Sequence, residues 1–379
     1  MGKTRSLRLD LNAPRVLAIF GIILFHVTQY FKTHEFPGHQ ADSTDILGEI
    51  ISKPALVIFV LLAGIAHAFG TPRLATLQAY LPYVRTKLRQ IMLPYLCVSL
   101  LSMGVKLAAP GGRDSGAVGD WLLNMLWVPN GGPAGHLWFL YWLMTIFLFW
   151  PLLAPLTTPG RLPFLAGGLF LLAVQPIPLP ATHAGSCFGL ANLQRLLPVF
   201  VLGVWYGSTM LTRQKRYARV VIVSGSVFAA WLAAYFTWFA FFKEGNQSDQ
   251  YAPALLFKTG HAVGELSGAI FLLHLSGLAG GLLRRGRKFL GFLACHSFDT
   301  YLLHVAFVAH PLVLALSFLA RRLELRPGAG AEYVLFFVVA ILVSLITPAL
   351  GAWIRRAPVL PVLLFGEAPR KRTPAPSGG

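Results

Sequence analysis

The first apolar run of the sequence, PRVLAIFGIILFHV (residues 14–27), contains two ionisable side chains, Arg15 and His26. An α-helix turns about 100° and rises about 1.5 Å per residue, so eleven positions bring both side chains to one face, about 16 Å apart along the axis. Asn12 precedes Arg15 by three residues and Gln29 follows His26 by three, which extends this polar stripe at both ends. Ionisable groups inside a membrane span are rare and tend to mark functional paths, so the stripe is the first candidate site.

Each of the two residues also has a purely structural interpretation. Arg15 stands at the start of the apolar run, where an arginine commonly extends to the lipid head groups and anchors the helix. His26 lies well inside the run and can be a packed histidine that is hydrogen-bonded between helices. As a functional group, its imidazole can act either as a general base toward a hydroxyl or as a nucleophile.

A second group of polar residues lies in HSFDTYLLH (residues 296–304). Ser297, Tyr301 and His304 are spaced by four and three positions, so they share one helical face. Asp299 is an acid in an otherwise apolar segment. It is either a candidate site residue or an acid in the first turn of a helix, where it stabilises the N-terminus.

Three cations stand at alternate positions in YVRTKLRQIMLPY (residues 83–95), namely Arg85, Lys87 and Arg89. Guanidinium and ammonium groups bind phosphate oxygens well, so this segment is a candidate docking site for a phosphorylated cytosolic cofactor. The alternative is the basic charge that cytoplasmic segments of membrane proteins ordinarily carry.

The elements that must position these residues are membrane-spanning helices. The 379 residues are 55% hydrophobic and 12% charged, which is about half the charged content of a typical soluble domain. The mean hydropathy is +0.63, and apolar runs of about 18–25 residues recur along the whole chain. The scattered Cys97, Cys187 and Cys295 have neither metal-site nor disulfide spacing, and we expect no metal.

Hydropathy predicts an all-α transmembrane helix bundle with about ten spans. They lie near residues 14–32, 50–70, 91–109, 135–157, 163–180, 194–212, 218–242, 260–283, 290–319 and 332–354. The segments on the side of the termini contain 22 of the 32 lysines and arginines, so the positive-inside rule places both termini in the cytoplasm. The net charge of +18 therefore reflects topology, and no nucleic-acid partner is expected.

The chain divides into one transmembrane domain and one tail. The domain extends over residues 1–355. Residues 356–379 are predicted to form a basic, Pro/Gly-rich cytoplasmic tail, and we expect the last dozen residues, APRKRTPAPSGG, to be disordered. The run WLLNMLWV (residues 121–128) is too short to cross a membrane and is predicted to lie at the interface.

Several of these stretches occur in the order found in a known family. NAPRVLAIFGIILFH, FVLLAGIAHAF, RTKLRQIMLPY, HLWFLYWL and SFDTYLLH follow one another along the chain. In this order they resemble the acyltransferase-3 family of bacterial integral-membrane O-acyltransferases, over about residues 8–355. The branch that the chain resembles most is that of glucan biosynthesis protein C and related sugar acyltransferases.

The resemblance implies roles for the first-span and basic motifs. Arg15 and His26 match the paired first-span residues that are essential for transfer in the family. Arg85, Lys87 and Arg89 cover its basic motif near the acyl-CoA entrance, and together with Arg15 they are expected to hold the phosphates of CoA.

The later motifs also have family counterparts. Trp138, Phe139 and Leu140 match the family's Trp-Phe-Leu, and Tyr301 with His304 match its late Tyr-Leu-x-His. Together with Asn12, Gln29 and Asp299, the residues Trp138, Tyr301 and His304 are expected to contact the acceptor or support the site.

The chain departs from the family pattern at three places. Asn12 stands where the family often has Asp, and Ala63-Gly64 stands where it often has Ser-Gly. The family's Arg-x-Arg reads here as Arg-x-Lys or Lys-x-Arg.

The function implied by the resemblance is O-acyl transfer across a membrane. An acyl group, which we expect to be acetyl, would move from cytosolic acetyl-CoA or another acyl-CoA to a hydroxyl of an extracytoplasmic or lipid-linked glycan. The expected location is a bacterial inner (plasma) membrane, crossed many times. Membrane lipid, the glycan acceptor and polysaccharide-synthesis machinery are the expected partners.

Two other functions are alternatives to the enzyme. A transporter of an acylated or glycosylated small molecule would use the polar stripe as a substrate path, but no inverted repeat with broken helices is visible in the hydropathy. A non-catalytic scaffold of polysaccharide export would leave His26 and His304 unexplained.

Overall fold

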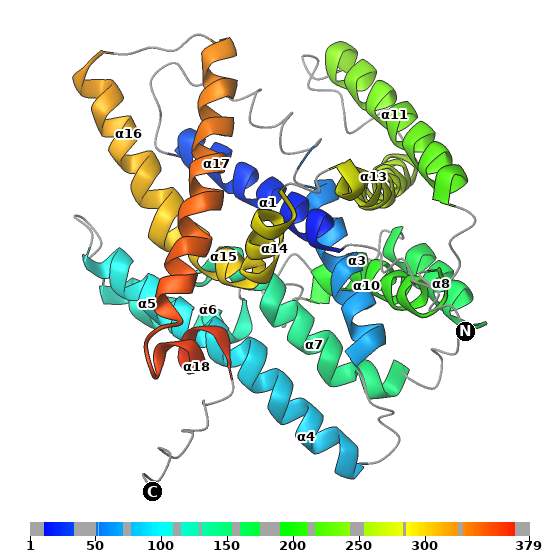
Figure 1. Ribbon diagram of the computed structural model, residues 1–379, viewed down its shortest axis with the longest axis horizontal. Helices are drawn as coiled ribbons and strands as arrows, with labels where there is room; N and C mark the ends of the chain where they lie inside the picture. Colours follow the sequence, from blue (N-terminus) through cyan, green and yellow to red (C-terminus); the bar gives the residue numbers. More distant parts are fainter. Residues whose placement is uncertain are drawn as a thin grey trace, which may run out of the picture.

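The computed structural model describes residues 11–33, 51, 53–70, 77–108, 115–128, 131–153, 160–174, 190–210, 217–242, 254–282, 286–324 and 329–367. Within these residues every regular element is a helix, and no strand is present (Figure 1). The α-helices are α1 (Asn12–Thr33), α3 (Lys53–Gly70), α4 (Leu77–Lys87), α5 (Leu93–Ala108), α6 (Ser115–Trp127), α7 (Trp138–Leu153), α8 (Leu162–Val174), α10 (Leu190–Trp205), α11 (Tyr217–Phe242), α13 (Ala254–Leu282), α14 (Arg287–Cys295), α15 (Ser297–Leu303), α16 (His310–Arg322), α17 (Ala329–Ile354) and α18 (Leu360–Phe365). Short helical turns of other types are η2 (Leu88–Met92), η4 (Gly135–Leu137), η7 (Tyr206–Met210) and η11 (His304–Ala309).

The predicted all-helical class is confirmed, and several helices have the length and composition of membrane spans. Five stretches of the described residues qualify: Asn12–Lys32, Gln78–Ala108, Arg219–Thr237, Ser297–Arg322 and Ala331–Ile354. Two shorter helices, Lys53–Phe69 and Leu196–Thr209, are also apolar. The number of ten spans and the location of the termini stay predictions. The end of the span predicted at 163–180 and the whole of 368–379 lie outside the described residues.

Helix α1 is the centre of the bundle. It contacts α3, α13, α14, α15, α16 and α17 as well as η11, and in Figure 1 it lies between α3 and α17. Small and branched side chains such as Ala18, Ile23 and Val27 are completely buried along it. The helix predicted for the first apolar run is thus confirmed, and it is surrounded by the elements that carry the other candidate residues.

Helices α3 and α10 cross at a pair of glycines. A Cβ atom on Gly203 would meet the Leu61 carbonyl oxygen and lie 3.1 Å from the Cα of Gly64. A Cβ on Gly64 would in turn meet the carbonyl oxygen of Phe200. The two backbones are therefore in direct contact, which is the arrangement that small residues permit in membrane helix pairs. Gly64 belongs to the Ala-Gly pair noted above.

The span predicted at 290–319 is interrupted near its start. Helix α14 ends at Cys295, and α15 begins at Ser297 after His296, whose φ of −96° and ψ of 11° are not helical. The prediction of one continuous element is therefore wrong at this point. Two π-helical turns also coincide with candidate residues, because η2 includes Arg89 and η11 begins with His304. Such turns are rare and frequently mark functional sites.

Helix α18 lies in the stretch that the sequence analysis assigned to the tail. No helix was predicted after residue 355, but Pro361, Leu364 and Phe365 are buried, and α18 packs against α5 (Figure 1). The apolar residues of LPVLLF are enough to fold this short segment back onto the bundle.

The glycine contact between α3 and α10 generates a prediction about stability. Replacing Gly203 with Ala should lower the thermal stability of the detergent-solubilised protein, because the new methyl group forces two backbones apart at a cost of about 1–3 kcal/mol. Gly104 on α5 is the matched control, since no atom of the described residues lies within 4 Å of its Cβ position. There Ala should leave stability equal or higher, as its helix propensity predicts. Equal melting temperatures for the two variants would contradict the close crossing.

Candidate functional site

Three histidines from three different elements form a cluster beside α1. The ring centroid of His26 lies 5.2 Å from that of His304 and 5.9 Å from that of His136. The rings of His136 and His304 are 5.6 Å apart. His304 is completely buried, while His26 and His136 are half-buried. The predicted pair of His26 and His304 is therefore brought together, and a third imidazole completes the group.

The orientation of His304 is fixed by its own helix. Its Nδ1 lies 3.0 Å from the carbonyl oxygen of Thr300 and 2.9 Å from that of Tyr301. Carbonyl oxygens only accept hydrogen bonds, so Nδ1 carries the proton of the neutral ring. The Nε2 atom is then an acceptor, and it is buried with no hydrogen-bond partner among the described residues. A buried acceptor without a partner is costly and is a feature to expect where a substrate or a proton is received.

His136 was missed by the sequence analysis. It belongs to the short turn η4, directly before α7. The Tyr301 hydroxyl donates a hydrogen bond of 2.7 Å to the backbone carbonyl of His136 and so ties this turn to α15. The Nε2 of His136 is also buried without a hydrogen-bond partner among the described residues. The available signal was a histidine between a glycine-rich loop and an apolar helix, GHLWF, immediately before the Trp-Phe-Leu motif.

Aromatic rings surround the cluster on the side of α3 and α7. The Tyr301 ring stacks on Phe59 with centroids 5.6 Å apart and meets the edge of Phe139 at 6.0 Å. Tyr301 therefore supports the site through its ring and its hydroxyl. Phe139 of the Trp-Phe-Leu motif is one of these aromatic rings. Trp138 is half-buried, and its ring centroid lies 6.3 Å from that of Phe139.

Of the other members of the first-span stripe, Arg15 and Asn12 lie toward the start of α1, whereas Gln29 follows His26 by three residues. Arg15, Asn12 and Gln29 are half-buried on α1, and eleven residues of continuous helix separate Arg15 from His26, or about 16 Å. The structure thus confirms the helical spacing of Arg15 and His26 and leaves Arg15 at the opposite end of the stripe. Helix α14 packs against α1.

The three cations of the basic segment differ in burial and in the residues that they contact. Lys87 turns inward, with its Nζ 4.5 Å from the centroid of the Phe147 ring and 5.6 Å from that of Tyr83. This is cation–π geometry. Arg85 is exposed, and Arg89 is half-buried in η2. The three cations therefore have different surroundings, because alternate positions of a helix face nearly opposite directions. Their role in binding a phosphorylated cofactor stays a prediction.

Helix α7 leads from the turn that carries His136 to the ring that Lys87 contacts. Phe147, which Lys87 contacts, follows His136 by eleven residues. At about 1.5 Å per residue this is roughly 16 Å. The separation of Phe147 and His136 along the chain therefore equals that of Arg15 and His26 along α1.

Asp299 lies in the first turn of α15, as one of the two interpretations predicted, but it is not exposed to solvent. Its side chain is completely buried, and both of its oxygens pair with Arg355 from the end of α17, at 2.7 and 2.8 Å. His296 Nδ1 contacts the same carboxylate at 2.7 Å. The charged partner is 56 residues away in the sequence, and no local spacing could have identified it.

The arrangement suits proton transfer at an imidazole. Carbonyl groups fix the tautomer of His304, and two unpartnered Nε2 atoms lie within one cluster. Among the residues that the structure describes, no group of three or more His, Cys, Asp or Glu side chains is arranged to hold a metal ion. A hydroxyl that enters between the three rings would find nitrogen acceptors on more than one side.

Comparison with known proteins gives one match. Residues 8–352 match the acyltransferase-3 family model, which is described as an acyltransferase domain. This range contains the three histidines and the basic segment, and it ends before Arg355. Searches of curated proteins and of solved structures returned no match.

The hydrogen bond from Tyr301 generates a prediction about the cluster. Replacing Tyr301 with Phe should lower acyl-transfer activity by up to about a hundredfold, because a displacement of His136 by about 1 Å is enough for such a loss. The loss of stability should be about 1–3 kcal/mol, since a buried carbonyl loses its donor. Activity per folded molecule and the melting temperature are the two measurements.

The matched control is Tyr141, whose hydroxyl also donates to a backbone carbonyl. The Tyr141 hydroxyl donates to the carbonyl of Leu126 at 2.8 Å, outside the cluster. Tyr141→Phe should reduce stability to a similar degree and leave activity per folded molecule unchanged. Equal activity losses in both variants would show that Tyr301 has no special relation to His136.

Proposed function

Because the chain belongs to the acyltransferase-3 family, we propose that it transfers an acyl group, acetyl in the simplest case, from acyl-CoA to a hydroxyl of a glycan across a membrane. The family and the apolar helices support a membrane acyltransferase. The donor, the acceptor and the bacterial inner membrane as location are parts of this proposal. The observation that carries it is the cluster of His26, His136 and His304.

The proposed reaction uses an imidazole as a general base. His26 removes the proton of the acceptor hydroxyl while the hydroxyl oxygen forms a bond to the carbonyl carbon of the thioester. The carbon–sulfur bond then breaks, and the CoA sulfur leaves and receives the proton from the imidazolium. His304 and His136 lie within 6 Å of His26, ring centre to ring centre. The unprotonated Nε2 of His304 can accept a hydrogen bond from the base and stabilise its charged form.

The donor is proposed to bind at the other end of the polar stripe. Arg85 and Arg89 would contact the phosphates of CoA, and Arg15 near the start of α1 would contribute a third cation. The pantetheine arm is about as long as half of the bilayer core, roughly 15 Å. This length matches the separation of Arg15 and His26 along α1, so a donor whose phosphates lie near Arg15 would place its thioester at His26. The positive-inside rule predicts that this end faces the cytoplasm.

The histidine cluster generates the central prediction. Separate replacement of His26, His136 and His304 with Gln should each lower kcat by about 100-fold or more, because general-base catalysis contributes factors of that size. The measurement is release of CoA thiol from acetyl-CoA in the presence of glucan oligosaccharides, with protein in lipid nanodiscs.

The control for these variants is a buried histidine outside the cluster. His274 on α13 has its Nε2 2.6 Å from the Tyr206 hydroxyl, and His274→Gln should retain kcat per folded molecule. If the three cluster variants keep near-normal rates, the proposed site is wrong. If the protein is incubated with acetyl-CoA without acceptor and His26 carries an acetyl group after acid quenching, His26 acts as a nucleophile and not as a general base.

The donor site generates a second prediction. Arg85→Gln and Arg89→Gln should each raise the KM for acetyl-CoA about tenfold, since a charged hydrogen bond to phosphate contributes about 1.5 kcal/mol or more. The KM for the acceptor should stay unchanged. Arg321→Gln, at an exposed arginine at the end of α16, is the control and should behave as wild type. An unchanged affinity for CoA in both Arg85 and Arg89 variants would remove the assignment.

A further inference from the structure

We propose that residues 360–367, here termed the C-terminal strap, position the donor site relative to the histidine cluster. The strap consists of α18, Gly366 and Glu367. It contacts η2, which contains Arg89, and it is linked by ion pairs to α15, which leads into His304. This inference rests on the proposed function, because it assigns to the strap the task of aligning the two ends of the donor path.

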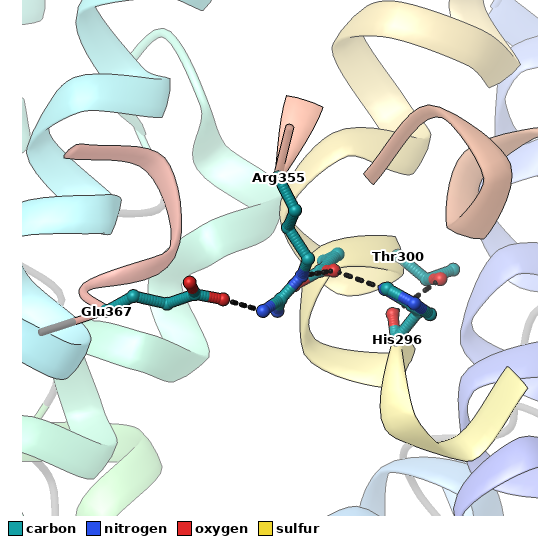
Figure 2. A network of polar contacts seen from close by, with 5 residues as sticks. His296, Thr300, Arg355 and Glu367 are labelled. Carbon is teal, nitrogen blue, oxygen red and sulfur yellow. Dashed lines mark hydrogen bonds and ion pairs between the residues drawn. The ribbon is translucent and has the colours of Figure 1, made fainter. Parts of the chain in front are cut away.

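The first link joins the strap to α15 through a chain of charges. Glu367 forms an ion pair with Nη1 of Arg355. The Nε and Nη2 atoms of the same guanidinium donate to the two oxygens of Asp299. Figure 2 shows Arg355 between Glu367 on one side and the turn of His296 and Thr300 on the other. Every nitrogen of the Arg355 guanidinium therefore has an acidic partner.

Asp299 is packed closely against α17. A Cβ atom on Gly351 of α17 would lie 2.8 Å from the Cβ of Asp299, so helices α15 and α17 are in close contact at this position. Asp299 is buried completely, and Arg355 additionally lies over the ring of Phe365 in the strap, 4.8 Å from its centroid. His304 follows Asp299 by five residues, or about 7.5 Å along the helix.

The second link joins the strap to the basic segment. Gly366 has a φ of 63°, a left-handed conformation that favours glycine. A Cβ on this residue would meet the carbonyl oxygen of Arg89 and lie 2.6 Å from the Cα of Gln90. The backbone of the strap therefore rests directly on η2. The bonds from the Gly366 amide to the carbonyl of Val362 and from the Glu367 amide to that of Pro361 close the turn.

These two links give Arg355 a role that differs from phosphate binding. Hydrogen bonding to Asp299 raises the pKa of Arg355 above its ordinary value, so the guanidinium stays charged and stays committed to its acidic partners. Arg355, Gly366 and Glu367 all follow residue 352, the last residue that matches the family. The strap therefore lies beyond the matched range and contacts two elements, η2 and α15, that lie within it.

The test measures the donor site and the histidine site separately. Glu367→Gln breaks the charge chain, and Gly366→Ala displaces η2 without changing any charge. Each variant should raise the KM for acetyl-CoA about fivefold or more while the KM for the glucan acceptor stays constant. The double variant should be no worse than the more severe single variant, because both act on one element. Arg356→Gln, the exposed arginine next to Arg355, is the matched control and should retain wild-type constants.

A distance measurement provides a readout that does not depend on activity. Spin labels at Gln90→Cys and Phe289→Cys, both exposed, are introduced after replacement of the three native cysteines with Ser. The distribution of distances between η2 and α14 should broaden in the Glu367→Gln and Gly366→Ala variants and stay narrow in Arg356→Gln.

Three results would overturn the inference. They are an unchanged KM for acetyl-CoA in both strap variants, an equal effect of Arg356→Gln, and an unchanged distance distribution. If the wild-type protein transfers no acyl group from acetyl-CoA, the proposed function fails instead, and the distance distribution alone then decides whether the strap positions η2.

Discussion

The constraint on which this structure depends is that polar groups inside an apolar helix bundle must face one another. No water is available at such positions, and an unsatisfied polar group costs several kcal/mol in lipid. His304 meets the constraint at Nδ1 by bonding to the carbonyls of its own helix. The turn that carries His136 meets it through the hydroxyl of Tyr301. What remains are the Nε2 atoms of His304 and His136, which are buried without a hydrogen-bond partner among the described residues, and this residual polarity is the chemistry that the site offers.

The same constraint applies more strongly to a buried charge. Asp299 has no exposed surface, so its negative charge has to be neutralised within the protein. Arg355 supplies the neutralisation with two hydrogen bonds, and its third nitrogen pairs with Glu367. As a result, a polar network lies at the start of α15, and the histidine cluster begins directly after its end. A short helix between two such anchors is held in place at both ends.

Much of the fold could be predicted because the responsible forces act locally along the chain. Hydropathy identified α1 and α17 with boundaries close to those observed, since about twenty apolar residues in sequence form a helix in any membrane. It could not identify the break at His296 or the helix α18. The break is accompanied by the contact of His296 with Asp299, which pairs with the distant Arg355, and α18 packs on a surface provided by α5.

For the site, the sequence by itself determined which residue types are present and how far apart they stand along each helix. This was enough to pair Arg15 with His26 and to single out His304, because helical spacing is fixed by backbone geometry. Only the tertiary structure decided that His136 joins His26 and His304 and that Lys87 lies over an aromatic ring. Those outcomes depend on which faces of different helices are packed together, and that choice is made by contacts between residues far apart in the chain.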